Sequence, residues 1–416
     1  MADDTDGAAP DRLVPDDATT EPGDVAGPGT TDARDPEAPW VEVAVPPFPD
    51  LPVELLEAHA TAHRELEHAV GGLSPDAVRT LGRWLTDHTT TALAGIYPSI
   101  SGAVTQPLFP PPRAFLSRRH VERRSGVAEA YRYIDVQVTL ARMGLEPHPL
   151  RIETPFVLHA LVEGRRTSDD ETNPAVLRSR TSAWVARVSP YAHPPAAVVR
   201  PLAERIVIDA AMTDAPAPAV AAWIAFCWMS LHPWVDGNGR TARLLYLLVA
   251  ARSTPSLDLG AIELMTERRN DYVQALQQGQ WTTPTWDAEL LDATPFAIRT
   301  TQWSVLGAQR NRRRAEALDA CVGEVAALGG LEDAAAALIV HAGIERLLTP
   351  AHLEELAIDT DEDRTAPAAA LEALADLGAL VRRPLPPSRR VDGRPGVGYA
   401  PAPALSEPIA RLLAAT

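Results

Sequence analysis

The chain has 416 residues, of which 46% are hydrophobic, and its formal net charge is −17 at neutral pH. This length accommodates two or three domains, each with its own core, and the hydrophobic content is ordinary for a globular protein. The acidic balance argues against general affinity for nucleic acids or anionic membranes, and leaves open a local basic patch. The chain contains no lysine, so all 38 basic residues are arginine. This bias suggests GC-rich codon usage and a bacterial source.

The beginning of the chain differs in composition from the rest. Residues 2–39 carry eleven acidic residues against Arg12 and Arg34. They hold too few apolar side chains to offset the entropy of ordering, so we predict a disordered acidic tail over residues 1–45. The tail lacks the basic region and apolar run of a signal peptide, and the chain has no uninterrupted apolar run of about 18 residues. Cys227 and Cys321 lie in apolar helical patterns, which favours buried thiols in a reducing cytoplasm.

Helical patterning begins near Leu51. Apolar residues and two histidines recur at steps of three and four residues and predict a helix that ends at Gly71-Gly72. The recurring positions are Leu55, Leu56, His59, His63, Leu66 and Val70. A second helix is expected from Ser74-Pro75, followed by a loop over the Pro- and Arg-rich residues 105–125.

The middle of the chain predicts more helices and one short strand. Helical patterning returns over 128–143, and Thr154 is the expected N-cap of a helix that reaches Glu163. Residues 182–188 alternate apolar and polar side chains, as in a short strand or hairpin. Further helices are expected at 196–209, 217–231 and 239–252. The first 330 residues are therefore predicted to be mainly α.

The last 80 residues predict a separate unit. A short helix over 352–357, a second helix over 365–377 and two short strands joined by a basic loop follow the pattern of a winged helix. The basic residues of this region are Arg382, Arg383, Arg389, Arg390 and Arg394. They offer phosphate contacts, but the second helix lacks the Arg, Asn or Gln side chains that contact base edges. We therefore expect protein docking or dimer contact ahead of sequence-specific DNA binding.

The segment from Leu231 to Arg243, LHPWVDGNGRTAR, concentrates the polar groups needed to handle a nucleotide. An apolar helix ends at His232-Pro233, because proline cannot extend the helical hydrogen-bond ladder. Asp236-Gly-Asn-Gly239 is a turn with little side-chain bulk, and another apolar helix follows directly. Backbone N–H groups exposed at a glycine-rich turn that opens a helix form an anion site.

The charged residues of this segment fit the same ligand. Arg240 and Arg243 are three residues apart on the first helical turn, where cations oppose the helix dipole but match phosphate oxygens. Asp236 is a hard oxygen ligand suited to Mg²⁺ bound to phosphates. His232 titrates near neutral pH and suits a general base for a hydroxyl nucleophile. Each feature alone is common in structural roles, whereas their combination within twelve residues favours a site.

The segment resembles the signature of the Fic family, His-Pro-aromatic-x-Asp-Gly-Asn-Gly-Arg-x-x-Arg, with Trp234 at the position where phenylalanine is usual. The resemblance implies a mainly α Fic fold with a short β-hairpin flap, and transfer of AMP from ATP to a Ser, Thr or Tyr hydroxyl of a target protein. His232 would take the hydroxyl proton and Asp236 would hold Mg²⁺. Trp234 is expected to be a core anchor.

The resemblance also implies which residues hold the triphosphate. Gly237, Asn238 and Gly239 would form the anion hole of the α-phosphate. Arg240 would hold the β-phosphate and Arg243 the γ-phosphate, which orients pyrophosphate as the leaving group.

Three segments outside the signature resemble further parts of the family. Residues 185–195 and the helix after them are similar to the flap that aligns the target. Glu267 to Tyr272 resembles the R-x-x-Y helix that closes the nucleotide pocket, so Tyr272 is expected near the adenine. Residues 97–102 align with the family's inhibitory helix, with Ser101 in place of the glutamate that pairs with the second signature arginine. The resemblance thus implies that self-inhibition by this glutamate is missing.

These features divide the chain into an acidic tail (1–45), an N-terminal helical region (46–150), a Fic core domain (151–300), linking helices (301–345) and a winged-helix-like domain (346–416). The expected cofactors are ATP and Mg²⁺, and the expected partner is a target protein, with self-modification and a homodimer left open. Two alternatives remain. The scaffold could transfer UMP, phosphate or phosphocholine, or the chain could be a DNA-binding regulator that senses nucleotide.

Overall fold

The computed structural model describes residues 43–93, 118–145, 150–163, 177, 191–254, 258–281, 283, 285–344, 366–384 and 396–415. Several predictions concern segments outside these ranges. They are the acidic tail, the inhibitory stretch with Ser101, the strand at 182–188, the helix at 352–357 and most of the basic loop near the C-terminus.

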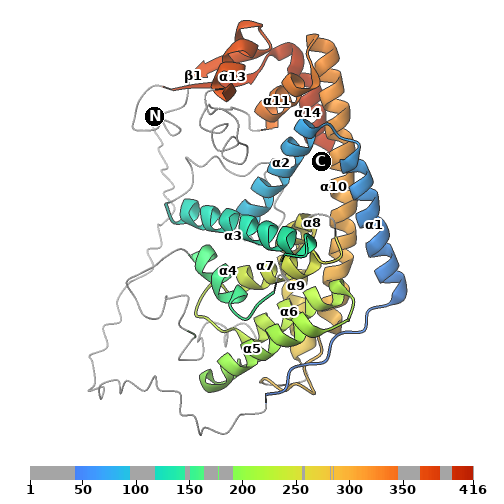
Figure 1. Ribbon diagram of the computed structural model, residues 1–416, viewed down its shortest axis with the longest axis vertical. Helices are drawn as coiled ribbons and strands as arrows, with labels where there is room; N and C mark the ends of the chain where they lie inside the picture. Colours follow the sequence, from blue (N-terminus) through green and yellow to red (C-terminus); the bar gives the residue numbers. More distant parts are fainter. Residues whose placement is uncertain are drawn as a thin grey trace, which may run out of the picture. The chain divides into compact units, whose positions relative to one another are not determined.

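Helices make up most of the described chain (Figure 1). In chain order the helices are α1 (Val53–Gly71), α2 (Pro75–Leu93), α3 (Arg118–Arg142), α4 (Thr154–Glu163), α5 (Ala196–Met212), α6 (Ala217–Leu231), α7 (Asn238–Ala250), α8 (Leu259–Glu267), α9 (Arg269–Gln280), α10 (Thr294–Gly329), α11 (Asp333–Ile344), α13 (Ala366–Asp376) and α14 (Ser406–Ala415). A short 3₁₀ helix covers Pro403–Leu405, and the two strands are β1 (Leu380–Pro384) and β2 (Val397–Pro401). The expectation of a mainly α fold with a small hairpin is confirmed.

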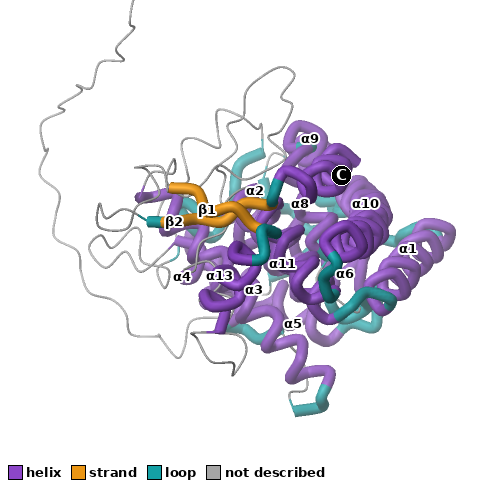
Figure 2. Tube along the Cα trace, turned by 90° about the horizontal axis from the view of Figure 1, so that it is seen from above, coloured by secondary structure: helices purple, strands orange, loops and turns teal. Residues whose placement is uncertain are grey.

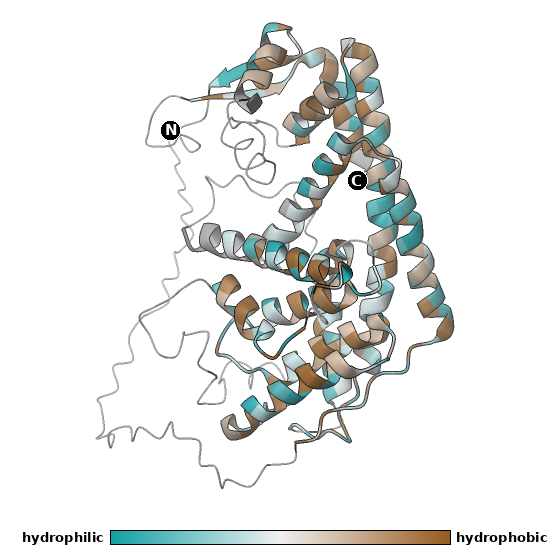
Figure 3. Ribbon diagram, viewed as in Figure 1, coloured by the Kyte–Doolittle hydropathy of each residue, from teal (hydrophilic) through white to brown (hydrophobic). Residues whose placement is uncertain are grey.

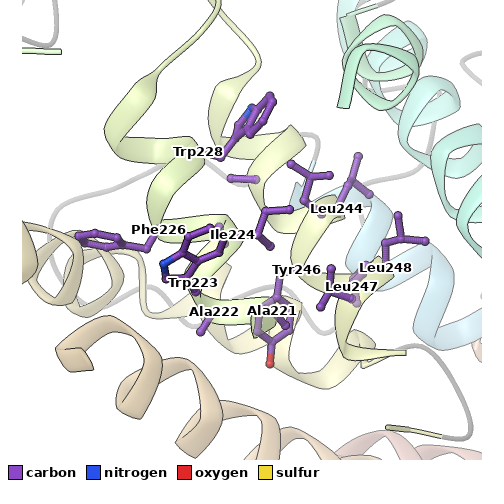
Figure 4. Close-up of a cluster of buried hydrophobic side chains, with 14 of the residues drawn as sticks. Ala221, Ala222, Trp223, Ile224, Phe226, Trp228, Leu244, Tyr246, Leu247 and Leu248 are labelled. Carbon is purple, nitrogen blue, oxygen red and sulfur yellow. The ribbon is translucent and has the colours of Figure 1, made fainter. Parts of the chain in front are cut away.

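The first hydrophobic core is centred on α6 and α7, the two helices that flank the predicted site. Almost every residue of α6 is buried, because its sequence is apolar on all sides. Figure 4 shows Ile224 of α6 close to Leu244 of α7, whereas Phe226 points away from α7. The Trp223 indole N–H donates to the carbonyl of Pro46 at 2.9 Å, so this buried donor is satisfied. Both ends of the site loop are thereby fixed in the interior.

A second core joins the C-terminal elements to α2. Leu81 and Trp84 of α2 pack with Leu318 of α10, Leu371 of α13 and Ile409 of α14. The strands β1 and β2 form an antiparallel hairpin in which Arg382 pairs with Tyr399 (Figure 2). The C-terminal elements therefore share their apolar surface with α2 and α10.

The helix α10 is continuous over 36 residues and contributes to both cores. Phe296 and Trp303 belong to the first core, and Leu318 and Val325 to the second. Figure 3 shows hydrophilic and hydrophobic residues side by side along both α1 and α10, as amphipathic helices require. The boundary predicted at residue 300 falls inside α10.

Two sequence-based expectations differ from the structure. Residues 118–125 are expected in a loop but belong to α3, because the prolines of this region end at Pro112 and the arginines that follow are good helix formers. Thr154 is not the N-cap but the first residue of α4, and its hydroxyl accepts from the backbone N–H of Arg151 at 2.9 Å. The helix α14 has no counterpart in the sequence analysis.

The C-terminal order of helix α13 followed by hairpin strands agrees with the elements expected there, and Gly378, at φ +74°, separates them. The winged-helix assignment and the division into domains stay predictions. No single helix in the described ranges is both long and apolar enough to cross a bilayer. The helices α10 and α11 are long and apolar enough only when taken together, and the chain bends by 111° between them.

Candidate functional site

The predicted site lies on the loop between α6 and α7, and His232 is its first residue. His232 ends α6 in a left-handed conformation, with φ 50° and ψ 61°, and its N–H donates to the Trp228 carbonyl at 2.9 Å. No other described residue apart from glycine has a positive φ. This conformation costs an L-residue roughly 1–2 kcal/mol. Such strain concentrates at functional sites, so the outlier supports a functional role for this histidine.

A side-chain clamp closes the loop behind His232. Asn238 accepts a hydrogen bond from the Trp234 N–H at 3.0 Å and donates one to the Trp234 carbonyl at 2.7 Å. The Trp234 ring is buried and stacks on His159, with 3.9 Å between ring centroids. Its expected role as a core anchor is consistent with this position. The clamp holds the Asn238 side chain against the Trp234 backbone, and the backbone N–H of Asn238 belongs to the first turn of α7.

The N-terminus of α7 carries no side-chain cap. Gly237 is the N-cap residue of α7, at φ 81°, and it has no side chain that could accept from the first N–H groups of the helix. A Cβ at Gly237 would lie 2.6 Å from Glu163 Oε1 and 2.9 Å from His159 Nε2. Gly239 is less crowded, since the atom nearest to a Cβ at that position would be Arg243 Nη1 at 3.6 Å. Backbone donors and the positive end of the helix dipole therefore coincide at this turn.

Asp236 lies at the exposed side of the turn. Its side chain is 59% exposed, and Oδ1 accepts from the Gly237 N–H at 2.7 Å. The Asp236 carbonyl accepts from His159 Nε2 at 2.9 Å. Magnesium keeps several waters and binds through one or two carboxylates together with substrate phosphates. An exposed carboxylate beside an anion site fits this requirement.

Arg240 is buried and anchored by α4. Its guanidinium forms an ion pair with Glu163 and donates to the Val162 carbonyl at 3.0 Å. A longer contact of 3.4 Å reaches Asp236. No local pattern in the sequence links Glu163 to this turn, because Glu163 lies more than seventy positions before Asp236. Two carboxylates thus fix Arg240 at the turn and offset its charge.

Arg243 lies in different surroundings, between α3 and α9. Its guanidinium stands over the Tyr272 ring, 5.9 Å from the ring centroid. Burial lowers the pKa of Arg243, the phenol groups of Tyr272 and Tyr131 act in the opposite direction, and Arg269 lowers it further. No carboxylate of the described residues forms an ion pair with Arg243. Arg243 is therefore a cation without a described counter-ion, next to the uncapped helix end.

Tyr272, expected near an adenine, is almost completely buried. Its ring meets Phe296 edge to face, with 5.2 Å between centroids, and burial raises the pKa of its phenol. The structure therefore brings Tyr272 together with Arg243 on one side of the site. Ser101 lies outside the described residues.

A second histidine, His193, lies beside His232 and was not predicted from the sequence. Its ring stacks on that of His232, and its Nδ1 lies 2.9 Å from the Ser230 carbonyl, to which it donates. The segment that carries it is held by a parallel bridge between Ala192 and Thr285. In the sequence, His193 is marked only by its position directly before Pro194-Pro195, and this pattern is too common to indicate a role.

Comparisons with known proteins agree with the sequence signature. Residues 157–250, which include the whole segment from His232 to Arg243, match the model of the Fic/DOC family. No curated protein sequence matches the chain.

Solved structures that match the chain include a Fic family protein from Desulfovibrio desulfuricans G20, at 16% identity, with 86% of this chain and 98% of that chain covered and a TM-score of 0.45. Fic-1 (residues 134–508) from C. elegans is 20% identical over 62% of this chain and 72% of its own, with a TM-score of 0.43. A Fic domain containing signaling protein from Bacteroides thetaiotaomicron VPI-5482 is 15% identical. The match covers 63% of this chain and 98% of that protein's chain, with a TM-score of 0.44.

Proposed function

We propose that this chain is a protein adenylyltransferase, which transfers AMP from ATP to a Ser, Thr or Tyr hydroxyl of a protein. The observation that carries the proposal is the start of α7, which has no side-chain N-cap, six positions after a histidine held in a left-handed conformation. An anion site and a residue able to accept a proton thereby lie on one short loop. The match to the Fic/DOC family model supports a transferase of this kind.

In the proposed reaction, the hydroxyl oxygen of the target attacks the α-phosphorus of ATP. The bond from this phosphorus to the oxygen bridging to the β-phosphate breaks, and pyrophosphate leaves. His232 takes the hydroxyl proton, and the stacked ring of His193 keeps the imidazole in one orientation.

The backbone N–H groups of Asn238 and Gly239 would receive the α-phosphate, where negative charge develops in the transition state. Arg240 and Arg243 would hold the β- and γ-phosphates. Arg240 is already oriented by Glu163 and Val162, so its geometry costs little to organise when ATP binds. Arg243 would exchange its aromatic surroundings for phosphate oxygens.

Asp236 would hold Mg²⁺, which when bound neutralises charge on the phosphates. The exposed carboxylate fits a hydrated ion, and its contact with the Gly237 N–H fixes one oxygen at the turn.

Labelled ATP tests the proposal. The purified chain is incubated with a bacterial protein extract and with ATP labelled in either the α- or the γ-phosphate. We expect protein-bound label from the α position alone, a mass increase of one AMP on a hydroxyl residue, and loss of both in His232→Ala. His68→Ala serves as the matched control, because His68 is an exposed histidine on α1.

Other outcomes select the alternatives. Label from the γ position alone means phosphate transfer, and label from UTP in place of ATP means transfer of UMP. Operator binding that depends on ATP and is unchanged in His232→Ala, without any labelled protein, favours the nucleotide-sensing regulator.

A further inference from the structure

Two histidines of α1 face the protein interior. His59 and His63 are four residues apart, so their side chains lie on one face of the helix, and each is only 4% exposed. Their rings lie 4.4 Å apart between centroids. The other face of α1 carries charged residues in contact with solvent. Two adjacent buried imidazoles need a specific reason, since leucine would pack there at lower cost.

The third member of this cluster comes from a distant part of the chain. Asp258 is the N-cap of α8, is 3% exposed, and accepts from the Ala261 N–H through Oδ1 at 3.2 Å. Its other oxygen, Oδ2, lies 4.0 Å from His63 Nε2. One ligand atom from each of His59, His63 and Asp258 can be chosen so that all three lie within 4.8 Å of one another. No other group of three such residues meets this condition in the described parts of the chain.

Two hydroxyl groups complete the surroundings. Ser304 of α10 donates to Asp258 Oδ2 at 2.5 Å and lies 2.9 Å from His63 Nε2. Tyr246 of α7 reaches the same carboxylate oxygen at 3.3 Å. His63 Nδ1 has no hydrogen-bond partner although the side chain is almost fully buried. A proton shift from Nε2 to Nδ1 leaves the ring neutral and turns the Nε2 lone pair toward Asp258.

These distances suit an ion of the zinc class. Zinc bonds to imidazole nitrogen and carboxylate oxygen are about 2.0–2.2 Å long, so one ion can reach both His63 Nε2 and Asp258 Oδ2 after a small adjustment. Ser304 Oγ stands where a fourth oxygen donor, hydroxyl or water, is needed. Because all three ligands are buried, no coordination position opens to solvent, which favours a structural site over a catalytic one.

We propose that His59, His63 and Asp258 bind one divalent transition-metal ion of the zinc class, which fastens α1 to the start of α8. Such an ion forms a coordinate bond with His63 Nε2 and neutralises the buried carboxylate of Asp258. Its effect is on stability, because only the folded chain brings residues 59 and 258 together.

Metal content tests this proposal directly. The full chain, free of any affinity tag, is loaded with Zn²⁺, dialysed against metal-free buffer and assayed for bound zinc. We expect one equivalent to be retained, and we expect Co²⁺ to give the intense visible absorption of a tetrahedral nitrogen and oxygen site. Absence of retained zinc in the wild-type chain overturns the proposal, and leaves a purely hydrogen-bonded cluster.

Variants assign the metal to these residues. His59→Gln and His63→Gln are expected to bind zinc about 100-fold more weakly or worse, since even supporting residues around metal ligands change affinity by about 10–100-fold. His68→Gln, on the same helix but exposed, should bind as tightly as the wild type. Unchanged affinity in His59→Gln contradicts the assignment.

Folding of each variant is checked by circular dichroism. If either substitution prevents folding, the wild-type chain decides through its melting temperature, which should rise with Zn²⁺ and not with Mg²⁺. No rise with zinc contradicts the proposal. AMP transfer plays no part in these readouts, so they stand apart from the proposed function.

Discussion

The imidazole rings of His193 and His232 are stacked, with 4.4 Å between their centroids and 19° between their planes. His193 is itself fixed, because its Nδ1 donates to the Ser230 carbonyl two residues before His232. The stack therefore joins the segment before α5 to the end of α6, and it limits the rotation of the ring proposed to accept the proton. His193 is a positioning residue in this arrangement.

Replacing His193 tests this role. We expect His193→Ala to lower kcat for AMP transfer about 10–100-fold with little change in the KM for ATP, since small displacements of a reacting group are costly. His193→Phe, which keeps a flat ring, should recover part of the loss. Steady-state kinetics with labelled ATP gives both parameters. A rise in the KM for ATP of about 10–100-fold, with kcat unchanged, would contradict a positioning role.

Gly237 is expected to be indispensable for two reasons. Its backbone has a positive φ, and the space where a Cβ would lie is occupied by neighbouring side chains. Gly237→Ala places a Cβ 2.6 Å from Glu163 Oε1 at φ 81°, so it should destabilise the fold by about 1–3 kcal/mol and abolish labelling. Gly144→Ala is the matched control, because Gly144 also has a positive φ (70°) but no atom within 4 Å of a Cβ. Chemical unfolding of both variants separates the conformational cost from the clash. Equal losses would show that the clash contributes nothing.

The stability of the fold should decrease in mild acid, in part through His159. Burial lowers the pKa of this histidine to about 4, from an ordinary value of 6.5. Between these two pH values the unfolded chain binds a proton that the folded chain does not, so stability falls as the pH is lowered through this interval. The largest contribution of this histidine is about 3 kcal/mol, reached near pH 4.

Urea unfolding of the wild type and of His159→Gln from pH 7.5 to 4 measures this effect. The variant should lose less stability than the wild type over the interval. A nuclear magnetic resonance titration that gives His159 a pKa near 6.5 would contradict the prediction.

The expected absence of an inhibitory glutamate leads to a further test. If Ser101 occupies that position, Ser101→Glu should reduce self-labelling with ATP, because a carboxylate there would pair with Arg243, which has no described carboxylate beside it. Ser99→Glu adds the same charge two positions away and serves as the control. Undiminished labelling in Ser101→Glu would contradict the alignment or the inhibitory mechanism.

The local parts of this molecule could be predicted from its sequence. The bounds of α6 match the expected helix because proline and apolar residues mark both ends, and the Asp236–Gly239 turn follows from its composition. The start of α3 was not predicted, since its first turns carry arginine and no regular apolar pattern. The helix α14 was missed although Ile409, Leu412 and Leu413 recur at helical spacing. Proline and arginine content proved a poor guide to residues 118–125.

The contacts that complete the site were invisible in the sequence. Glu163 and His193 belong to other elements, and only the folded chain brings them to Arg240 and His232. The helical spacing of the α1 histidines is visible in the sequence. Their partner Asp258 lies nearly 200 positions away, and no periodic pattern indicates such a pairing.

The unbroken course of α10 limits how this protein can move. At 36 residues the helix is about 54 Å long, and its two halves are embedded in different sets of apolar side chains. A hinge near residue 300 would require breaking consecutive backbone hydrogen bonds inside a helix. Domain closure about that point is therefore not available to the chain, and truncation after residue 300 would remove Trp303 from the first core and Leu318 from the second.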